Sequence, residues 1–517
     1  MSEPMDIPRS ANQLAADDRR FFGHPRGLST LFFTEMWERF SFYGLRPLLV
    51  LFMSAAIASG GFDIPREQAA AIVGIYASSV YLASLPGGWI ADRLLGLRRS
   101  IMTGAVFISA GHISISFSSL AQTRVPFFVG LILIVLGTGL LKPNISAIVG
   151  DLYPEGGARR DAGFSIFYMG INIGAFLGNI VTGFLGEKIG WHFGFGAAGV
   201  GMLIGLAWFA VRSRKTLGTF GLEPTRHPDP AVQARHQLYI KIAIAIGLGL
   251  IALVIVLTAV GMIHINPQVV GQYMAYVLGG VAVLYFGYIF LAGGLTREEM
   301  KRVAVIFILF VFASIFWAAF EQAPTSLNLF AKDFTDRQMF RWEIPATWFQ
   351  SVNSLMIFIL APVFAWLWVA LGKRGRSLSS PTKFSVGLFF AAAGFGIMIF
   401  PANFLVSTGG AIRVSAMWLI ISYFMQTIGE LCLSPVGLSS MTKLSPRKYV
   451  GQMMGVWFLA SSVGNLIAGL VGGRVDPEKL GQTPTLFIIT TAALFVAGVI
   501  LAVLTPLIKR LIPPEAA

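Results

Sequence analysis

Long apolar segments recur along the chain from about residue 28 to residue 510, and they constrain the fold more than any other feature. A helix crosses a bilayer with about 20 apolar residues, and many of these segments reach that length. The composition agrees, because 55% of the residues are hydrophobic and only 12% are charged, which is about half of the charged share of soluble domains. A transmembrane β-barrel would instead show alternating segments of ~10 residues. The sequence therefore predicts an all-α polytopic membrane protein.

The apolar segments form groups of six, two and six, which predicts fourteen transmembrane helices. The spans are predicted near residues 28–53, 68–91, 98–120, 126–149, 161–186, 191–211, 238–263, 268–293, 300–330, 345–371, 383–402, 411–440, 447–472 and 483–510. After the sixth span comes a polar stretch with three prolines, RSRKTLGTFGLEPTRHPDPAVQARHQ, which is typical of a linker. The two following spans contain almost no ionisable residues, so we expect them to form a peripheral hairpin.

These groups set the predicted domain boundaries. The domains are a cytoplasmic tail at 1–26, an N-terminal six-helix bundle at 27–212, a linker with the two-helix insertion at 213–297, a C-terminal six-helix bundle at 298–511 and a cytoplasmic tail at 512–517. Two six-helix bundles joined in this way would have the organisation of a major facilitator transporter, whose binding site lies at the membrane midplane between the halves.

The formal net charge of +14 reflects topology. Arginine and lysine cluster in alternate loops, near residues 93–99, 159–160, 212–215, 297–302, 373–383 and 443–448. Cytoplasmic loops carry such an excess of basic residues, so these loops and both termini are predicted to be cytoplasmic. The charge therefore indicates no nucleic-acid partner.

Ionisable residues inside the predicted spans are the first candidates for function, because each costs several kcal/mol in lipid. The stretch FFTEMWERFSFYGLRPLLVLFM, residues 32–53, carries four of them: Glu35, Glu38, Arg39 and Arg46. Helical spacing puts these four on one face, which we expect to line a water-filled cavity. The alternative is that the charges only hold helices together, since buried polar groups need partners.

Three further charges lie well inside other predicted spans, away from the span ends, and they are Lys142, Glu321 and Glu430. Buried lysine shifts its pKa readily, so Lys142 could exchange carboxylate partners as these take up protons; a static pair is the alternative. The buried charges sum to +1 in the N-terminal half and −2 in the C-terminal half. A zwitterion with separated charged ends would complement such a cavity.

Several motifs resemble one transporter family. EMWERFSFYG at 35–44 resembles the ExxERFxYYG motif of the proton-dependent oligopeptide transporter (POT/PTR) family of the major facilitator superfamily. GGWIADRLLGLRRS resembles the superfamily's loop between helices 2 and 3, and the family's signatures continue in GTGLLKPNISAIVGDLY, FSIFYMGINIGAFLG, FEQ, FQSVNSL, GELCLSPVGLS and MMGVWFLA. The two-helix insertion resembles the bacterial members. The motif's first tyrosine is replaced by Phe42, which removes a hydroxyl group from the expected cavity.

The resemblance implies a binding site for small peptides. Arg46 and Lys142 would bind the peptide carboxylate, which a guanidinium can do bidentately, and Glu430 would bind the amino terminus. Asn172 and Asn353 would donate to and accept from a peptide bond. For Asn172 an interhelical hydrogen bond is the alternative role, and for Asn353 it is packing.

Other residues would complete the site and couple it to protons. Tyr43 and Tyr81 would supply hydroxyl groups and Trp457 would wall a side-chain pocket, although Tyr81 and Trp457 could equally be packing aromatics. The residues implied in proton coupling and gating are Glu35, Glu38, Arg39, Glu321 and Lys142.

The expected function is a proton-coupled symporter that imports di- and tripeptides by alternating access, acting as a monomer in the bacterial inner membrane with lipid around it and no cofactor except the proton. Another zwitterion or anion, such as nitrate or a peptide-like drug, remains the alternative substrate. An intramembrane enzyme would need a motif such as HExxH or GxSxG, and the sequence contains neither. A non-transporting peptide sensor has no recognisable signalling domain to support it.

Overall fold

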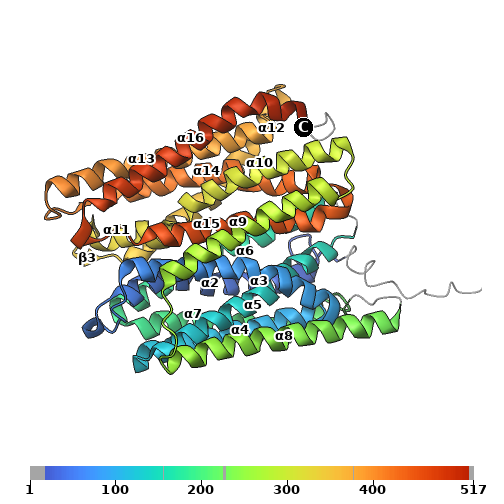
Figure 1. Cartoon of the computed structure of the whole chain (residues 1–517), viewed down its shortest axis with the longest axis horizontal. Coiled ribbons are helices and arrows are strands. Elements are labelled where there is room, and N and C mark those ends of the chain that lie inside the picture. Colours follow the sequence, from blue (N-terminus) through green and yellow to red (C-terminus); the bar gives the residue numbers. More distant parts are fainter. Residues whose placement is uncertain (1–17, 155–156, 225–228, 377, 512–517) are drawn as a thin grey trace, which may run out of the picture. The chain divides into compact units, whose positions relative to one another are not determined.

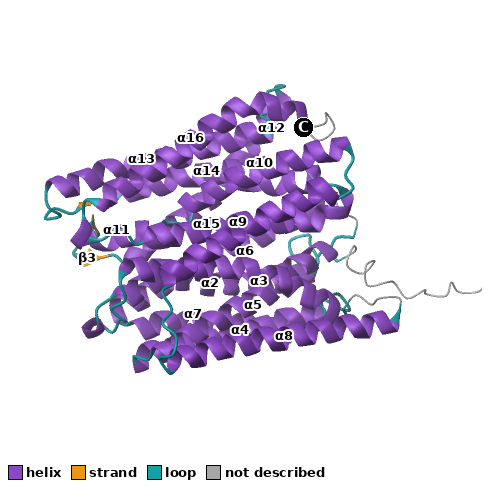
Figure 2. Ribbon diagram, viewed as in Figure 1, coloured by secondary structure: helices purple, strands orange, loops and turns teal. Residues whose placement is uncertain are grey.

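The computed structural model describes residues 18–154, 157–224, 229–376 and 378–511 (Figure 1). Residues 1–17 of the first predicted tail and the whole second tail, 512–517, lie outside the described residues. Helices make up nearly all of the described chain, and the few strands are very short (Figure 2). The all-α prediction is therefore confirmed.

The described residues contain fourteen long helices. They are α2 (Arg26–Ser54), α3 (Arg66–Ile90), α4 (Leu97–Ala121), α5 (Arg124–Asp151), α6 (Gly157–Phe184), α7 (Trp191–Thr216), α8 (Pro230–Ala259), α9 (Pro267–Ala292), α10 (Arg297–Phe320), α12 (Gln350–Lys373), α13 (Ser380–Ser407), α14 (Met417–Leu444), α15 (Val450–Gly472) and α16 (Gln482–Leu511). Each predicted span coincides with one of them.

Shorter elements connect or extend these helices. Turns of π-helix follow three of them, at Ala91–Leu95, Leu185–Ile189 and Ala323–Leu327. The short helix α11 (Asn328–Asp333) comes next, and turns of 3-10 helix lie at Ile57–Ser59, Ala346–Phe349, Arg447–Tyr449 and Pro477–Lys479. Strand β1 (Thr335–Asp336) pairs in parallel with β4 (Val414–Ser415), and β2 (Gln338–Met339) pairs antiparallel with β3 (Trp342–Glu343).

Among the residues that the structure describes, thirteen helical segments are long and apolar enough to cross a membrane. The long helix outside this group is α2, because every 18-residue window of it holds at least three ionisable residues. Helix α2 is therefore set apart by the same buried charges that make it a candidate functional element.

The polar stretch after α7 differs from its prediction. Helix α7 continues to Thr216, and α8 begins at Pro230, eight residues before the predicted span. Asp229 caps α8 by accepting a hydrogen bond from the backbone N–H of Ala231 at 2.8 Å. Proline at the first helical position after a capping aspartate favours the start of a helix. This local signal explains why α8 begins within a stretch whose polar composition predicted a linker.

The described residues form two compact units. Unit 1 contains residues up to Leu45, then Ala83–Gly178 and His192–His264. Unit 2 contains Arg46–Leu82, Asn179–Trp191 and the residues from Ile265 onward. The predicted boundaries at 212 and 298 come from counting the spans, whereas these two units are defined by how the helices pack. The division into two six-helix bundles therefore stays a prediction.

Helices α4 and α5 of unit 1 touch along their backbones. A Cβ added at Gly104 would lie 2.5 Å from the carbonyl oxygen of Gly137, and one at Gly111 would lie 2.6 Å from that of Gly130. Small residues allow such close approach between helices in a membrane. These glycines therefore fix how α4 and α5 pack.

Helix α8 is peripheral in unit 1. None of its apolar 18-residue window is buried. Its N-terminal turns contact the π-helical turn after α3, where Gln233 donates to the backbone oxygen of Arg93 at 3.5 Å and His236 Nδ1 lies 3.2 Å from Arg93 Nη1. Helix α8 is thus held at its polar end and exposed along its apolar length.

Candidate functional site

Three charges of helix α2 form a buried cluster in unit 1. Arg39 Nε lies 3.3 Å from Glu35 Oε1 and forms a hydrogen-bonded ion pair with Glu38. All three side chains are at most 2% exposed. One guanidinium between two carboxylates leaves a net negative charge in a region where charge is costly, so the cluster is suited to taking up a cation or a proton.

The aromatic residues that follow on α2 pack against Arg39. The guanidinium carbon lies 4.8 Å from the ring centroid of Phe42 and 5.9 Å from that of Tyr43. A cation–π contact uses the face of the ring, and Phe42, which is 1% exposed, supplies such a face without a hydroxyl. The departure from the family motif therefore keeps the contact with Arg39.

Lys142 belongs to the electrostatic surroundings of this cluster. It lies on α5, is half-buried, and interacts electrostatically with Glu35. Unit 1 therefore brings together four of the residues predicted to couple protons, two carboxylates and two cations. Such an arrangement can exchange ion-pair partners when one carboxylate is protonated.

Asn172 is buried on α6 in the same unit. Its Nδ2 donates to the backbone oxygen of Tyr168, one turn earlier, at 3.0 Å. Near it, α6 touches α2, because a Cβ on Gly174 would lie 2.2 Å from the backbone oxygen of Met36. Asn172 is thus held on a helix that packs directly against the charged helix, and its role in binding stays a prediction.

In unit 2, the guanidinium of Arg46 binds two partners. Its Nη2 lies 2.6 Å from Glu321 Oε2 and donates to Asn465 Oδ1 at 3.0 Å. The side chains of Arg46 and Glu321 are 6% and 8% exposed. Glu321 ends helix α10 just before the π-helical turn, and Asn465 lies on α15. A predicted carboxylate-binding residue and a predicted proton-coupling residue are therefore direct partners.

Asn353 and Glu430 also meet in unit 2. Asn353 Nδ2 donates to Glu430 Oε2 and to Thr427 Oγ1, both at 3.0 Å. Glu430 also interacts electrostatically with Glu321. A carboxylate held by an amide, near a second carboxylate, is suited to binding an ammonium group.

The two predicted aromatic residues of unit 2 make packing contacts. The ring of Tyr81 stacks on that of Phe458 with centroids 6.5 Å apart. Trp457 is 5% exposed and lies edge-on to Phe384, with centroids 6.4 Å apart. A Cβ on Gly437 would lie 2.1 Å from Trp457 Cη2, so this glycine makes room for the indole. Both contacts agree with the packing alternative, and their roles in binding stay predictions.

Sequence reasoning missed Asn465 and Thr427, which the structure places beside predicted site residues. Both are polar residues within apolar spans, and this could have pointed to them. Many serines and threonines also lie within apolar spans, so the feature does not single out a site residue. Within the described ranges, no group of three or more His, Cys, Asp or Glu residues could hold a metal ion.

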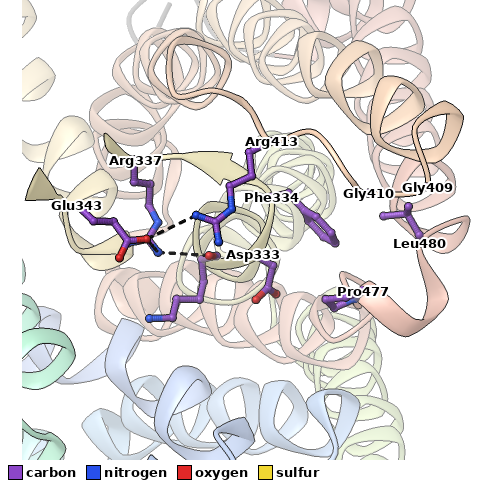
Figure 3. A pocket seen from close by; sticks show the side chains of 10 residues that line it. Asp333, Phe334, Arg337, Glu343, Gly409, Gly410, Arg413, Pro477 and Leu480 are labelled. Atoms are coloured by element: carbon purple, nitrogen blue, oxygen red, sulfur yellow. Dashed lines mark hydrogen bonds and ion pairs between the residues drawn. The ribbon is translucent and has the colours of Figure 1, made fainter. Parts of the chain in front are cut away.

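An open pocket of ≈ 460 Å³ in unit 2 lies apart from these clusters (Figure 3). Glu343 lines it and accepts a hydrogen bond from Arg337 Nη2 at 2.7 Å, while Arg413 Nη1 lies 3.6 Å away. Burial opposes ionisation of Glu343, but the hydrogen bond from Lys188 and the charge of Arg337 prevail and lower its pKa below the ordinary value. The twelve predicted site residues do not line this pocket, so it is a separate feature.

Paired charges buried among helices that are long and apolar enough to span a membrane are typical of a polytopic membrane transport protein. Residues 98–485 match the POT family, and the chain belongs to that family. It is similar to the peptide transporter YePEPT of Yersinia enterocolitica subsp. palearctica serotype O:3 (strain YE-P4), with 48% identity over 493 residues that cover 95% of this chain and 96% of that protein. It is also similar to the di-/tripeptide transporter of Lactococcus lactis subsp. cremoris, with 36% identity and coverage of 95% and 97%.

A solved structure of the peptide transporter POT in complex with sulfate has a TM-score of 0.88 to this chain. The sequence identity is 40%, and the match covers 98% of this chain and 99% of the other. The predicted major facilitator fold and the resemblance to the POT family are therefore confirmed. Because the family and these relatives are transporters, the enzyme alternative is set aside.

Proposed function

We propose that the protein is a proton-coupled symporter that imports di- and tripeptides by alternating access. The names of its relatives support the substrate class. The observation that carries the proposal is that Arg46 and Glu430 lie in one compact unit, each held by a neutral amide, from Asn465 and Asn353. A cation and a carboxylate positioned in this way match the two ends of a zwitterion.

The substrate contacts follow from this arrangement. Arg46 would bind the peptide carboxylate bidentately, Glu430 would bind the amino terminus, and Asn353 would turn an amide hydrogen from Glu430 to the peptide. Lys142 would assist with the carboxylate. The residues proposed to contact the remainder of the peptide are Tyr43, Tyr81, Asn172 and Trp457.

Proton coupling would act through the pair of Arg46 and Glu321. Protonation of Glu321 removes the charge that holds the guanidinium, which is then free for the peptide carboxylate. Deprotonation restores the pair and expels the substrate. The cluster of Glu35, Glu38 and Arg39 would act in the same way with Lys142. Each proton that enters down a potential of 100 mV supplies about 2.3 kcal/mol.

The remaining parts of the proposal concern setting and assembly. The basic loops and both termini would lie in the cytoplasm of a bacterium, with the chain in its inner membrane. Two six-helix bundles, 27–212 and 298–511, would alternate access as a monomer surrounded by lipid. The proton would serve as the coupling ion, with no other cofactor.

Uptake of labelled dialanine into proteoliposomes tests the function. With an inward proton gradient we expect concentrative uptake that a protonophore abolishes. Excess unlabelled dipeptide should compete, whereas nitrate should not. The test variant is Glu430→Gln, which keeps the hydrogen bond from Asn353 but removes the negative charge proposed to bind the amino terminus. It should weaken uptake about tenfold or more.

Two results would contradict the proposal. Uptake that ignores the gradient would remove the coupling assignment. No uptake by folded protein, or competition by nitrate rather than by dipeptides, would point to another anion or zwitterion as the substrate.

A further inference from the structure

The end of helix α6 carries a buried carboxylate that the proposed mechanism does not use. Glu187 lies in the π-helical turn Leu185–Ile189, and its side chain is 1% exposed. In unit 2 this turn contacts the segment from α11 to α12. The distribution of basic loops would place this turn on the side away from the cytoplasm.

Glu187 caps the beginning of another helical element. Its Oε1 accepts hydrogen bonds from the N–H and the hydroxyl of Thr347, both at 2.9 Å, and its Oε2 accepts one from the N–H of Ala346 at 3.1 Å. The turn Ala346–Phe349, which leads into α12, has no side-chain cap of its own. Free N–H groups at a helix start bind a carboxylate favourably.

Three neighbouring contacts join the same two segments. Lys332 of α11 donates to Glu187 Oε2 at 3.3 Å, and Lys188 pairs with Glu343 at 3.1 Å. Trp348 Nε1 donates to the backbone oxygen of Ile180 on α6 at 2.9 Å. We call the contacts of Glu187 and Lys188 with residues 332–348 the outer clasp.

The end of α6 and the segment from α11 to α12 also make contacts between uncharged residues. A Cβ added to Gly183 would lie 2.0 Å from Thr347 Oγ1, so only glycine permits this approach of α6. The aromatic ring of Phe184 lies 6.3 Å from that of Trp342, between centroids. The clasp is therefore close-packed around a fully desolvated, hydrogen-bonded carboxylate, and such contacts are costly to break.

We propose that the outer clasp is a gate lock, in which Glu187 holds α6 to the start of α12 and must release it each time the transporter opens away from the cytoplasm. The proposal rests on the proposed function, because in it α6 and α12 belong to different bundles and separate on that side. Glu187 is then a positioning residue that sets the balance between the outward-closed and outward-open states.

The test measures outward opening without relying on transport. A single cysteine replaces Ser78, a buried residue of α3 whose hydroxyl lies 2.7 Å from that of Ser462 on α15, and Cys432→Ser removes the native thiol. A membrane-impermeant maleimide is added outside, and its rate of reaction is followed. In this background Glu187→Gln should speed labelling about tenfold, because a charge-assisted cap is lost. Gly183→Ala should also speed it, by steric displacement of Thr347.

The controls separate gating from loss of structure. Glu478→Gln makes the same change at an exposed position in unit 2 and should leave the rate unchanged. A cysteine at Ala105, buried on α4 in unit 1, should react no faster in any variant, whereas unfolding would expose both cysteines. Unchanged labelling at Ser78 in both clasp variants overturns the gate lock. Dialanine uptake in the parent vesicles is measured separately, and its absence would overturn the proposed function whatever the labelling shows.

Discussion

Arg46 and Glu321 are 275 residues apart in the sequence, yet their side chains form a buried ion pair with 2.6 Å between Nη2 and Oε2. The pair links helix α2 to the end of α10, and Asn465 of α15 fixes the same guanidinium nitrogen. Breaking a buried pair by removing one partner is costly, because the other charge is left without compensation. Protonation of the carboxylate in this pair would therefore change how Arg46 is held in unit 2.

Replacing Glu321 by glutamine should uncouple transport from protons. Glu321→Gln leaves Arg46 without its anionic partner and removes the carboxylate proposed to carry the proton, so we expect proton-driven dialanine accumulation to fall at least about tenfold. Exchange of internal for external dialanine, which needs no net proton transfer, should persist. Glu298→Gln, at an exposed glutamate of the same helix, is the control and should accumulate normally. Full accumulation by Glu321→Gln would refute the coupling role.

The ring of Phe42 should stabilise unit 1 through Arg39. Phe42→Leu keeps an apolar side chain but removes the ring face that lies 4.8 Å from the guanidinium carbon. A desolvated cation–π contact contributes about 2 kcal/mol, so this variant should lose about that much more stability than Phe40→Leu. Phe40 is also buried on α2 and serves as the packing control. Thermal unfolding in detergent measures both, and equal losses would show that the cation–π contact contributes nothing.

The pH dependence of stability should include a contribution from Glu343 at acid pH. Its lowered pKa means that the folded state favours the ionised form, so the stabilisation is present above the ordinary pKa of 4.5 and is lost as the pH falls through the lowered value. Glu343→Gln should therefore lower the melting temperature at neutral pH and flatten its decline between about pH 5 and about pH 3. Glu478→Gln controls for the general loss of a carboxylate. Parallel declines in Glu343→Gln and the parent would contradict the assignment.

Adding a single methyl group at the glycine contact between α4 and α5 should destabilise the protein. Gly137→Ala would place a Cβ 2.6 Å from the backbone oxygen of Gly104, so the helices must separate, and we expect a loss of about 2 kcal/mol or more. The same substitution at Gly280 of α9 meets no atom within 4 Å. Since alanine favours the helix by about 1 kcal/mol over glycine, Gly280→Ala should be neutral or stabilising. Thermal unfolding distinguishes them, and similar stability in both variants would mean that α4 and α5 can shift apart freely.

Much of this protein follows from local sequence. The length and polarity of each apolar segment predict the fourteen long helices, because a membrane-spanning helix must satisfy its own backbone within one stretch of chain. The end of α7 was predicted too early in the chain and the beginning of α8 too late. The beginning of α8 depends on the cap formed by Asp229, which hydropathy does not show. The sequence also marked Glu35, Glu38, Arg39 and Arg46 as functional candidates, because charge in a span is costly wherever it pairs.

The tertiary structure alone decided which of these charges meet. Helical spacing could relate Arg39 to Glu35 on one helix, but it could not relate Arg46 to Glu321 and Asn465, or Glu430 to Asn353. The cap that Glu187 forms at Ala346 and Thr347 was equally hidden, since in the sequence Glu187 is a loop carboxylate next to a lysine. Hydrophobicity is a property of each segment by itself, whereas an ion pair or a helix cap depends on how separate segments pack, and that is settled only when the chain is folded.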